Sequence, residues 1–242
     1  MSRTLNVSWL TEPRPGNFGD ILSSYILSKY GYSVLYRPWN RIQAGDVICV
    51  GSIARLSKPD VIVLGSGIIS KKDVLDPLAK WIWVRGPRTR NRLIELGGNC
   101  SPIYGDPALL LPKIKSSSSK KFKIGIVPHH VDYEFYKKKY ADKKVINLID
   151  SDVEKVIEQI TECENIISSS LHGIITAHAY GIPAAWVKNK KLIGDDVKFL
   201  DYYESVNLEP VYTVEEKNQH PIYTLPNINV EKIHNILINA SF

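Results

Sequence analysis

Cysteine and long apolar runs are scarce in this sequence. The 242 residues include three cysteines, Cys49, Cys100 and Cys163, which lie far apart and form no CxxC pair. An odd, widely spaced set of this kind indicates neither a disulfide framework nor a zinc site, so we expect three buried thiols. No stretch approaches the roughly 18 apolar residues that a membrane span needs, and residues 1–9 lack the apolar core of a signal peptide. We therefore expect a cytoplasmic protein.

Charge is present in ordinary amounts but is unevenly placed. Charged residues make up 23% of the chain and hydrophobic residues 44%, which is ordinary globular usage and predicts a packed core rather than disorder. The formal net charge is +6, and lysines concentrate at 120–123, 137–144 and 188–191. We interpret these runs as solvated surfaces and leave open a peripheral association with an acidic membrane surface, including an inner membrane face. No nucleic-acid-binding module is recognisable, so we expect no nucleic-acid partner.

Short apolar β-rich runs alternate with helical patterns along the whole chain, which is typical of parallel sheets with crossover helices. We expect strands at 5–9, 34–36, 46–50, 61–64, 81–85, 122–127, 145–149, 165–168 and 184–187. We expect helices over 21–29, 87–96, 152–163 (capped by Ser151), 171–180 and 230–238.

The polar run PKIKSSSSKK at 112–121 has little to bury and is the candidate linker. We expect its residues from Lys115 onward to be exposed and mobile. The prediction is thus an α/β protein of two Rossmann-like domains, 1–114 and 115–242, which face each other across a cleft. The final helix is placed with the second domain, with packing back onto the first left open.

The loop GNFGD at 16–20 follows the first expected strand. In open parallel sheets, ligands lie beyond the carboxyl ends of the strands, so residues in such loops are candidates for a site. Here the candidates are Asn17, Gly19 and Asp20. The alternative interpretation is a structural turn in which Asp20 caps a helix.

Three further loops carry charged or titratable residues at strand exits. In VRGPRTR, planar guanidinium groups suit phosphate or carboxylate, so Arg85 and Arg88 are candidates for the cleft and Arg90 for the surface. Asp106 of YGDP is either a turn anchor or a cleft residue. His129 and His130 of PHHVD follow a strongly apolar strand and could transfer protons. No third and fourth ligands accompany them, so we expect no metal site.

The segment SSSLHG at 168–173 combines hydroxyl groups with the start of a helix. Unpaired N–H groups and the positive end of the helix dipole favour an anion there. The candidates are Ser169, Ser170, Leu171, His172 and Gly173. His172 could instead be a satisfied capping residue. A second histidine six residues later falls in the middle of the same helix, where we expect a structural role.

Taken together, these segments resemble the polysaccharide pyruvyl transferase family. The matching pieces are GNFGD, VRGPRTRNRLIELG, YGDPALLLP, IGIVPHHVDYE, SSSLHGIITAHAYGIPAAWV and KFLDYY, and they span nearly the whole chain. The resemblance implies a GT-B-like fold and transfer of the pyruvyl group of phosphoenolpyruvate to sugar hydroxyls, which leaves a ketal on a surface polysaccharide precursor. It implies no cofactor, with phosphoenolpyruvate as donor substrate and a sugar or lipid-linked oligosaccharide as acceptor.

The resemblance also suggests roles for individual residues. Family members hold phosphoenolpyruvate with arginines and with the Leu-His pair, which corresponds to Leu171 and His172. Many members have arginine just before this pair, where this chain has Ser170.

The pyruvyl transfer that the resemblance implies needs a general acid and a general base. Catalytic candidates are His172, Asp20, Asp106 and His129; Lys198, in the last matching block, is a candidate for substrate binding. The first domain would serve the acceptor and the second the donor.

Two other functions stay open. A GT-B glycosyltransferase that uses a nucleotide sugar would need a similar cleft and a diphosphate site. A non-catalytic binding protein of a glycan-assembly complex would fit the short chain and the serine in place of arginine.

Overall fold

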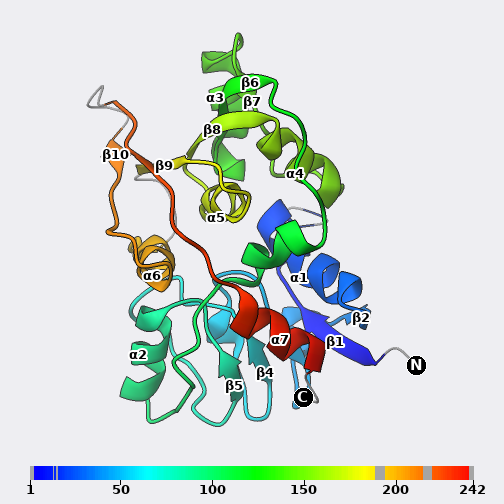
Figure 1. The fold of residues 1–242 in the computed structure, drawn as a ribbon. Helices are drawn as coiled ribbons and strands as arrows, with labels where there is room; N and C mark the ends of the chain where they lie inside the picture. The colour runs from blue at the N-terminus through cyan, green and yellow to red at the C-terminus, as the bar shows by residue number, and fades with distance from the viewer. Residues whose placement is uncertain (1–2, 13, 15, 189–193, 215–219, 240–242) are drawn as a thin grey trace.

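Two parallel β-sheets, each with its own helices, form the framework of the protein (Figure 1). The computed structural model describes residues 3–12, 14, 16–188, 194–214 and 220–239. In these residues helices and parallel strands alternate, so the α/β class predicted from the sequence is confirmed. No helix in the described part of the chain has the length and apolarity that a membrane crossing requires.

The first sheet has the strand order β2-β1-β3-β4-β5, and all its neighbours are parallel. Its strands are β1 (Thr4–Ser8), β2 (Ser33–Tyr36), β3 (Val47–Ile48), β4 (Ile62–Leu64) and β5 (Lys80–Trp83). The central strands β3 and β4 consist of buried β-branched and aliphatic residues, as expected where both faces of a sheet are covered.

The second sheet has the order β10-β9-β8-β6-β7. Its parallel strands are β6 (Phe122–Val127), β7 (Lys144–Val145), β8 (Cys163–Ser168), β9 (Ala184–Lys188) and β10 (Thr213–Val214), and β11 (Tyr223–Thr224) pairs antiparallel with β9.

Both sheets use the same strand order when each is counted from its own first strand. In each, the second strand lies outside the first, and the third, fourth and fifth follow on its other side. The direction of strand addition therefore reverses beside β1 in one sheet and beside β6 in the other. Ligand crevices of doubly wound sheets form at such a switch point, beyond the carboxyl ends of the strands.

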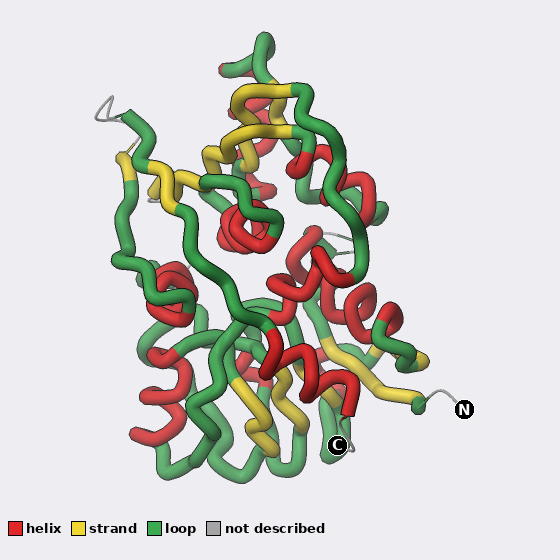
Figure 2. Tube along the Cα trace, viewed as in Figure 1, coloured by secondary structure: helices red, strands yellow, loops and turns green. Residues whose placement is uncertain are grey.

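Helices connect and cover the sheets (Figure 2), and the described residues form seven α-helices. They are α1 (Phe18–Lys29), α2 (Pro87–Glu95), α3 (Tyr133–Lys139), α4 (Val153–Thr161), α5 (Leu171–Ala179), α6 (Val197–Ser205) and α7 (Glu231–Asn239). Of these, α3 and α6 were not predicted from the sequence. The predicted cap of α4 was also wrong: Asp152, not Ser151, is the N-cap, because its side chain accepts a hydrogen bond from the Lys155 amide.

The last two helices lie against the first half of the chain. Helix α6 lies beside α2 (Figure 1), and Ile233 and Leu237 of α7 join the apolar cluster that contains Val7 of β1. In α7, His234 Nδ1 lies 2.6 Å from the Tyr30 hydroxyl, and the Leu237 carbonyl accepts from the Tyr32 hydroxyl at 2.8 Å. The chain thus crosses back from the second sheet to the first.

The candidate linker is exposed in part, but hydrogen bonds hold it to the second half. Lys115 Nζ contacts Glu158 at 2.8 Å, and its carbonyl accepts from the Tyr180 hydroxyl. Lys120 Nζ donates to the carbonyls of Thr161 and Cys163. These anchors are polar, so the scarcity of apolar residues in the run does not make it free of the second half.

One apolar cluster runs through both halves. It joins Val7 and Leu22 of the first half to Ile174 and Trp186 of the second. All three cysteines are buried and unpaired, as predicted.

Candidate active site

A cavity of about 480 Å³ lies where the carboxyl ends of the two sheets face each other. Both switch points contribute: the loops after β1 and β3 from the first sheet, and the loops after β6 and β8 from the second. The start of α6 also lines it. The polar lining residues are Glu12, Asn17, Asp20, Ser52, Arg55, His129, His130, Ser170, His172 and Lys198.

Asn17 and Asp20 are fixed by the start of α1. Asn17 is the N-cap: its Oδ1 accepts from the amides of Gly19 at 2.9 Å and Asp20 at 3.4 Å. Asp20 accepts in return from the amide and the side-chain nitrogen of Asn17, which completes a capping box. Asp20 therefore closes the cap rather than being the N-cap itself. Burial raises the pKa of its carboxyl to about 6, against the opposing effects of His172 and the Asn17 hydrogen bonds.

His172 lies in the first turn of α5, between Gly19 and Asp106. A Cβ at position 19 would overlap the imidazole ring, so the glycine makes room for it. His172 Nε2 is 3.6 Å from Asp106 Oδ2, and neither atom has a hydrogen-bond partner among the described residues. Asp106 is fully buried, and its Oδ1 caps the 3-10 helix Pro107–Lys113 through the Ala108 amide. The carboxylate is thus both a turn anchor and the neighbour of the imidazole.

The serines before α5 hold its start rigidly. Ser168 Oγ donates to the Val127 carbonyl at 2.7 Å and accepts from the Ser170 amide at 3.0 Å. Ser169 Oγ accepts from the His129 amide at 2.9 Å, which ties the two strand exits together. Gly173 packs so closely that a Cβ would meet Ser168 Oγ and Val127. Of the candidates Ser169, Ser170 and Gly173, Ser170 alone lines the cavity. Its side chain makes no capping hydrogen bond.

Two further basic side chains, Lys198 and Arg55, line the cavity. Lys198 is in the first turn of α6, and burial together with the charge of Arg85 lowers its pKa to about 8, while Asp196 and Asp20 oppose the shift. Arg55 is exposed, and its Nη1 donates to the Ser52 carbonyl at 3.4 Å. The cavity therefore combines a helix N-terminus with two basic side chains, an arrangement suited to a multiply charged anion.

His129 and His130 stack against each other with their ring centroids 4.3 Å apart. Burial, the neighbouring imidazole and Lys198 lower the pKa of His129 to about 3, and burial and Lys198 also lower that of His130. Both rings are thus neutral at pH 7. His129 Nδ1 is buried without a hydrogen-bond partner among the described residues.

The two predicted arginines do not line the cavity. Arg85 is fully buried: its guanidinium donates to Asp201 at 3.0 Å, to the Ser52 hydroxyl at 2.7 Å and to the Ile68 carbonyl at 2.7 Å. Arg88 donates to Glu204 of α6. Both therefore join α6 to the first half, because their carboxylate partners lie on that helix. Arg85 still acts on the site through its charge beside Lys198 and its bond to Ser52.

Ser52 and Arg55, which follow β3 and line the cavity, were not predicted as site residues. The signal was present, because 46–50 was predicted as a strand of the same sheet and its exit had to open at the same edge. His178, by contrast, is buried as expected: Nδ1 lies 3.0 Å from the Tyr202 hydroxyl and Nε2 lies 2.9 Å from the Thr224 carbonyl. Within the described ranges, no group of three or more His, Cys, Asp or Glu side chains is arranged to hold a metal ion.

Comparison with known families agrees with this geometry. Residues 16–191 match the model of the polysaccharide pyruvyl transferase family, and the match includes the start of α1 and the loops after β3, β6 and β8. The chain belongs to this family. The pyruvyl transferase match also contains Asp20, Asp106 and His172, whereas Lys198 lies beyond its end.

Two relatives carry the comparison further. The chain is 34% identical to an uncharacterized protein of Acanthamoeba polyphaga mimivirus over 171 residues, which is 66% of this chain and 60% of that protein. It is 26% identical to the succinoglycan biosynthesis protein ExoV of Rhizobium meliloti (strain 1021) over 208 residues, which is 81% of this chain and 64% of that protein. The chain thus spans less than two thirds of the length of either relative. None of the solved structures matches it significantly.

Proposed function

We propose that this pyruvyl transferase family member moves the pyruvyl group of phosphoenolpyruvate onto two hydroxyls of a sugar in a surface polysaccharide or glycan precursor. The observation that carries the proposal is the cavity itself. It combines the start of α5, the cations Lys198 and Arg55, and two groups able to move protons, Asp20 and His172. The relationship to a succinoglycan biosynthesis protein supports a polysaccharide acceptor.

Phosphoenolpyruvate carries a phosphate and a carboxylate, so its site needs two sources of positive potential. In this proposal the N–H groups at the start of α5 bind one anionic group, and Lys198 binds the other. Arg55, exposed at the rim, closes over the donor or guides it in. No metal or cofactor enters the proposed reaction.

The proposed reaction begins with protonation of the donor's methylene carbon, which becomes a methyl group. One sugar hydroxyl adds to C2 and loses its proton, the C2–O bond to phosphate breaks, and the second hydroxyl adds to C2 and loses its proton. Of the two hydroxyl protons released, one balances the proton given to the methylene carbon and the other leaves with phosphate. His172 is assigned the protonation, with Asp106 orienting its ring.

Asp20 is assigned the role of base toward the acceptor hydroxyls. Its pKa of about 6 leaves it mostly ionised at pH 7 yet basic enough to accept a proton. His129, with its pKa near 3, is a weaker base and is better suited to hydrogen-bond the acceptor.

The division of the chain into two halves is part of the same proposal. We divide the chain at 114/115 into two GT-B-like halves, with the acceptor on the first and the donor on the second. The repeated strand order and the cavity between the two switch points support this division.

The test incubates the purified chain with phosphoenolpyruvate and a panel of glycan acceptors. Phosphate release should match, one for one, the acceptor molecules that gain a pyruvate ketal by mass spectrometry. Thermal stabilisation by UDP or GDP, and none by phosphoenolpyruvate, would favour a nucleotide-sugar transferase instead. Stabilisation by phosphoenolpyruvate without turnover on any acceptor would favour a binding protein.

A further inference from the structure

A second hollow, larger than the cavity, lies on the second sheet. It measures about 690 Å³, and its floor is apolar: Ile124 and Ile126 of β6, Ile167 of β8 and Val187 of β9. Successive strand residues point to opposite faces. Ile166, the neighbour of Ile167, joins the core formed with α4 and α5, so the hollow lies on the opposite face of the sheet from these helices.

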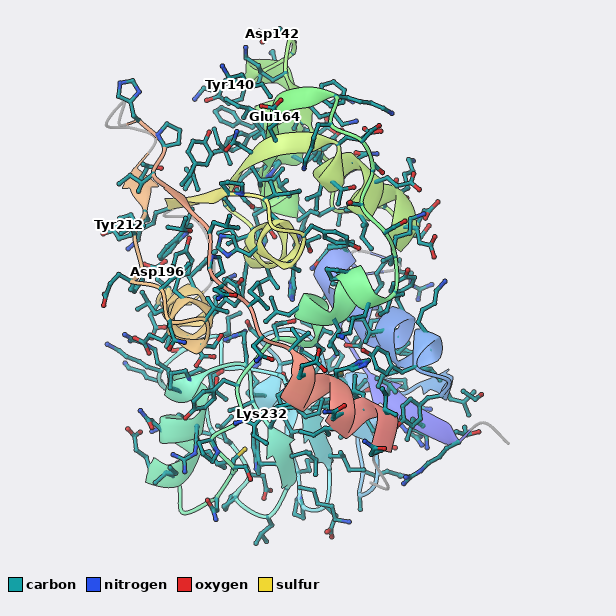
Figure 3. The ribbon with its side chains drawn as sticks, viewed as in Figure 1. Tyr140, Asp142, Glu164, Asp196, Tyr212 and Lys232 are labelled. Atoms are coloured by element: carbon teal, nitrogen blue, oxygen red, sulfur yellow. The ribbon has the colours of Figure 1, made fainter. Side chains whose placement is uncertain are left out.

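Aromatic and lysine side chains surround this floor. Phe122, Tyr136 and Tyr140 form apolar walls, and the charged lining residues are Lys123, Lys139, Lys143, Lys144 and one carboxylate, Asp142. We call this surface the lysine groove. Figure 3 labels Tyr140 and Asp142 at the end of the molecule opposite Lys232 of α7.

The segment 120–145, which contributes most residues of the lysine groove, is strongly positive. Residues 120–145 contain eight lysines and three carboxylates, a net +5 of the formal +6 of the whole chain. Part of it is balanced locally, since Lys121 and Lys144 lie near Glu162 and Lys143 lies near Asp142. A positive excess therefore remains at the lysine groove.

Apolar side chains project from the same end. Phe135 of α3 is 59% exposed and Val131, just before α3, is 62% exposed. Phe135 is followed within four residues by Lys137, Lys138 and Lys139, all exposed. An apolar side chain set among lysines is the pattern by which peripheral proteins bind anionic membranes, the lysines to headgroups and the apolar groups to the acyl boundary.

We propose that the lysine groove and α3 dock on a bilayer that contains acidic phospholipids. The headgroups bind the lysines of 120–145, Phe135 enters the acyl boundary, and the apolar floor receives part of one lipid chain. This inference does not depend on the proposed reaction. Docking would still affect the proposed reaction. His130 and Val131 line the cavity and lead directly into α3, so docking brings the cavity mouth close to the bilayer.

The test measures co-sedimentation of the full chain with vesicles of phosphatidylcholine alone or with about 30% phosphatidylglycerol. We expect binding to the anionic vesicles only, and loss of binding in about 0.5 M salt, because screening shortens the range of the attraction. The triple variant Lys137→Glu/Lys138→Glu/Lys139→Glu should weaken binding by about a hundredfold. Phe135→Ser should weaken it by about tenfold with the charge unchanged.

The matched control is Lys71→Glu/Lys72→Glu/Lys232→Glu, which changes the net charge equally at exposed positions far from α3. Circular dichroism and melting of each variant should match the wild type. The proposal is overturned if anionic vesicles do not bind, or if the control variant loses as much binding as the α3 variant. It is also overturned if vesicles remain unbound while the triple α3 variant or Phe135→Ser converts a dimer to monomers or loses bound RNA. A second copy or a nucleic acid would then be the occupant.

Discussion

His172 Nε2 and Asp106 Oδ2 face each other at 3.6 Å, at a place where the histidine is nearly buried and the aspartate fully so. The pair joins the two halves, because Asp106 follows the first sheet while His172 begins the helix after β8. A carboxylate behind an imidazole selects the tautomer and fixes the ring, so the other nitrogen and the ring edge can act on a ligand.

Replacing His172 by Ala should therefore reduce turnover by about a hundredfold or more, the usual contribution of a positioned acid or base. Asp106→Asn should reduce kcat about tenfold and leave KM for phosphoenolpyruvate nearly unchanged, because it disturbs orientation but not donor binding. Asparagine can keep the cap on the Ala108 amide, so the melting temperature should stay within a few degrees of the wild type. Steady-state kinetics on both variants check this. Wild-type kcat in Asp106→Asn would show that the carboxylate only anchors the turn.

His178 should matter to stability rather than turnover. His178→Ala leaves the Tyr202 hydroxyl and the Thr224 carbonyl without a partner and opens a void, so the free energy of unfolding should fall by about 2–4 kcal/mol. Turnover per folded molecule at low temperature should stay within about twofold. Denaturant titration and kinetics on the same preparation test both statements, and abolished turnover in a folded His178→Ala protein would contradict them.

The same residue should give an acid-dependent loss of stability. Burial lowers the pKa of His178 to about 4, below the 6.5 of an unfolded histidine, so protonation favours the unfolded chain. The stabilisation is complete above pH 6.5 and is lost as the pH falls toward 4, by on the order of 3 kcal/mol. Unfolding titrations between pH 7 and 4 should show a steeper decline for the wild type than for His178→Ala. Equal slopes would mean that other groups, such as His129, cause the decline.

The sequence predicted most of the framework because the signals were local. The apolar run at 122–127 matches β6 residue for residue, and SSSLHG begins α5 where the hydroxyl groups and the glycine suggested. Helix α6 was missed because a charged residue, Asp201, takes one of its buried positions, which breaks the apolar pattern of a helix. Helix α3 has seven residues, too few for a periodic pattern.

The site was harder to predict than the framework, because long-range pairing decides which charges are available. Nothing local distinguishes Arg85, which is bonded to Asp201 at a distance of 116 positions along the chain, from an arginine that faces a ligand. Nor does the sequence reveal that Gly19 is required by an imidazole from the other half. Arg55 follows a predicted strand, but only the meeting of the two sheets gives it a position at the cavity.

Donor binding should depend on pH through Lys198. Its pKa of about 8 means that the ammonium is charged below pH 8 and neutral above it, so affinity for phosphoenolpyruvate should fall as the pH rises from 7.5 to 9.5. Lys198→Arg should remove this dependence, since arginine stays charged throughout. The dissociation constant from thermal shifts at each pH is the measurement. An identical decline in the arginine variant would assign the titration to another group.

Ser170 and Lys198 line the same cavity. The family resemblance implies an arginine at position 170, so Lys198 is the candidate that compensates for its absence. If Lys198 supplies the missing cation, Lys198→Met should weaken phosphoenolpyruvate binding by about ten- to a hundredfold, the range for one hydrogen bond to a charged group. Adding Ser170→Arg to that variant should restore much of the affinity, because the guanidinium would extend from the start of α5 into the vacated space. The control Ser170→Gln adds length without charge and should not restore it. Calorimetric titration of the four proteins gives the answer: equal affinities for Lys198→Met and the double variant with arginine, both folded, would exclude a shared donor contact.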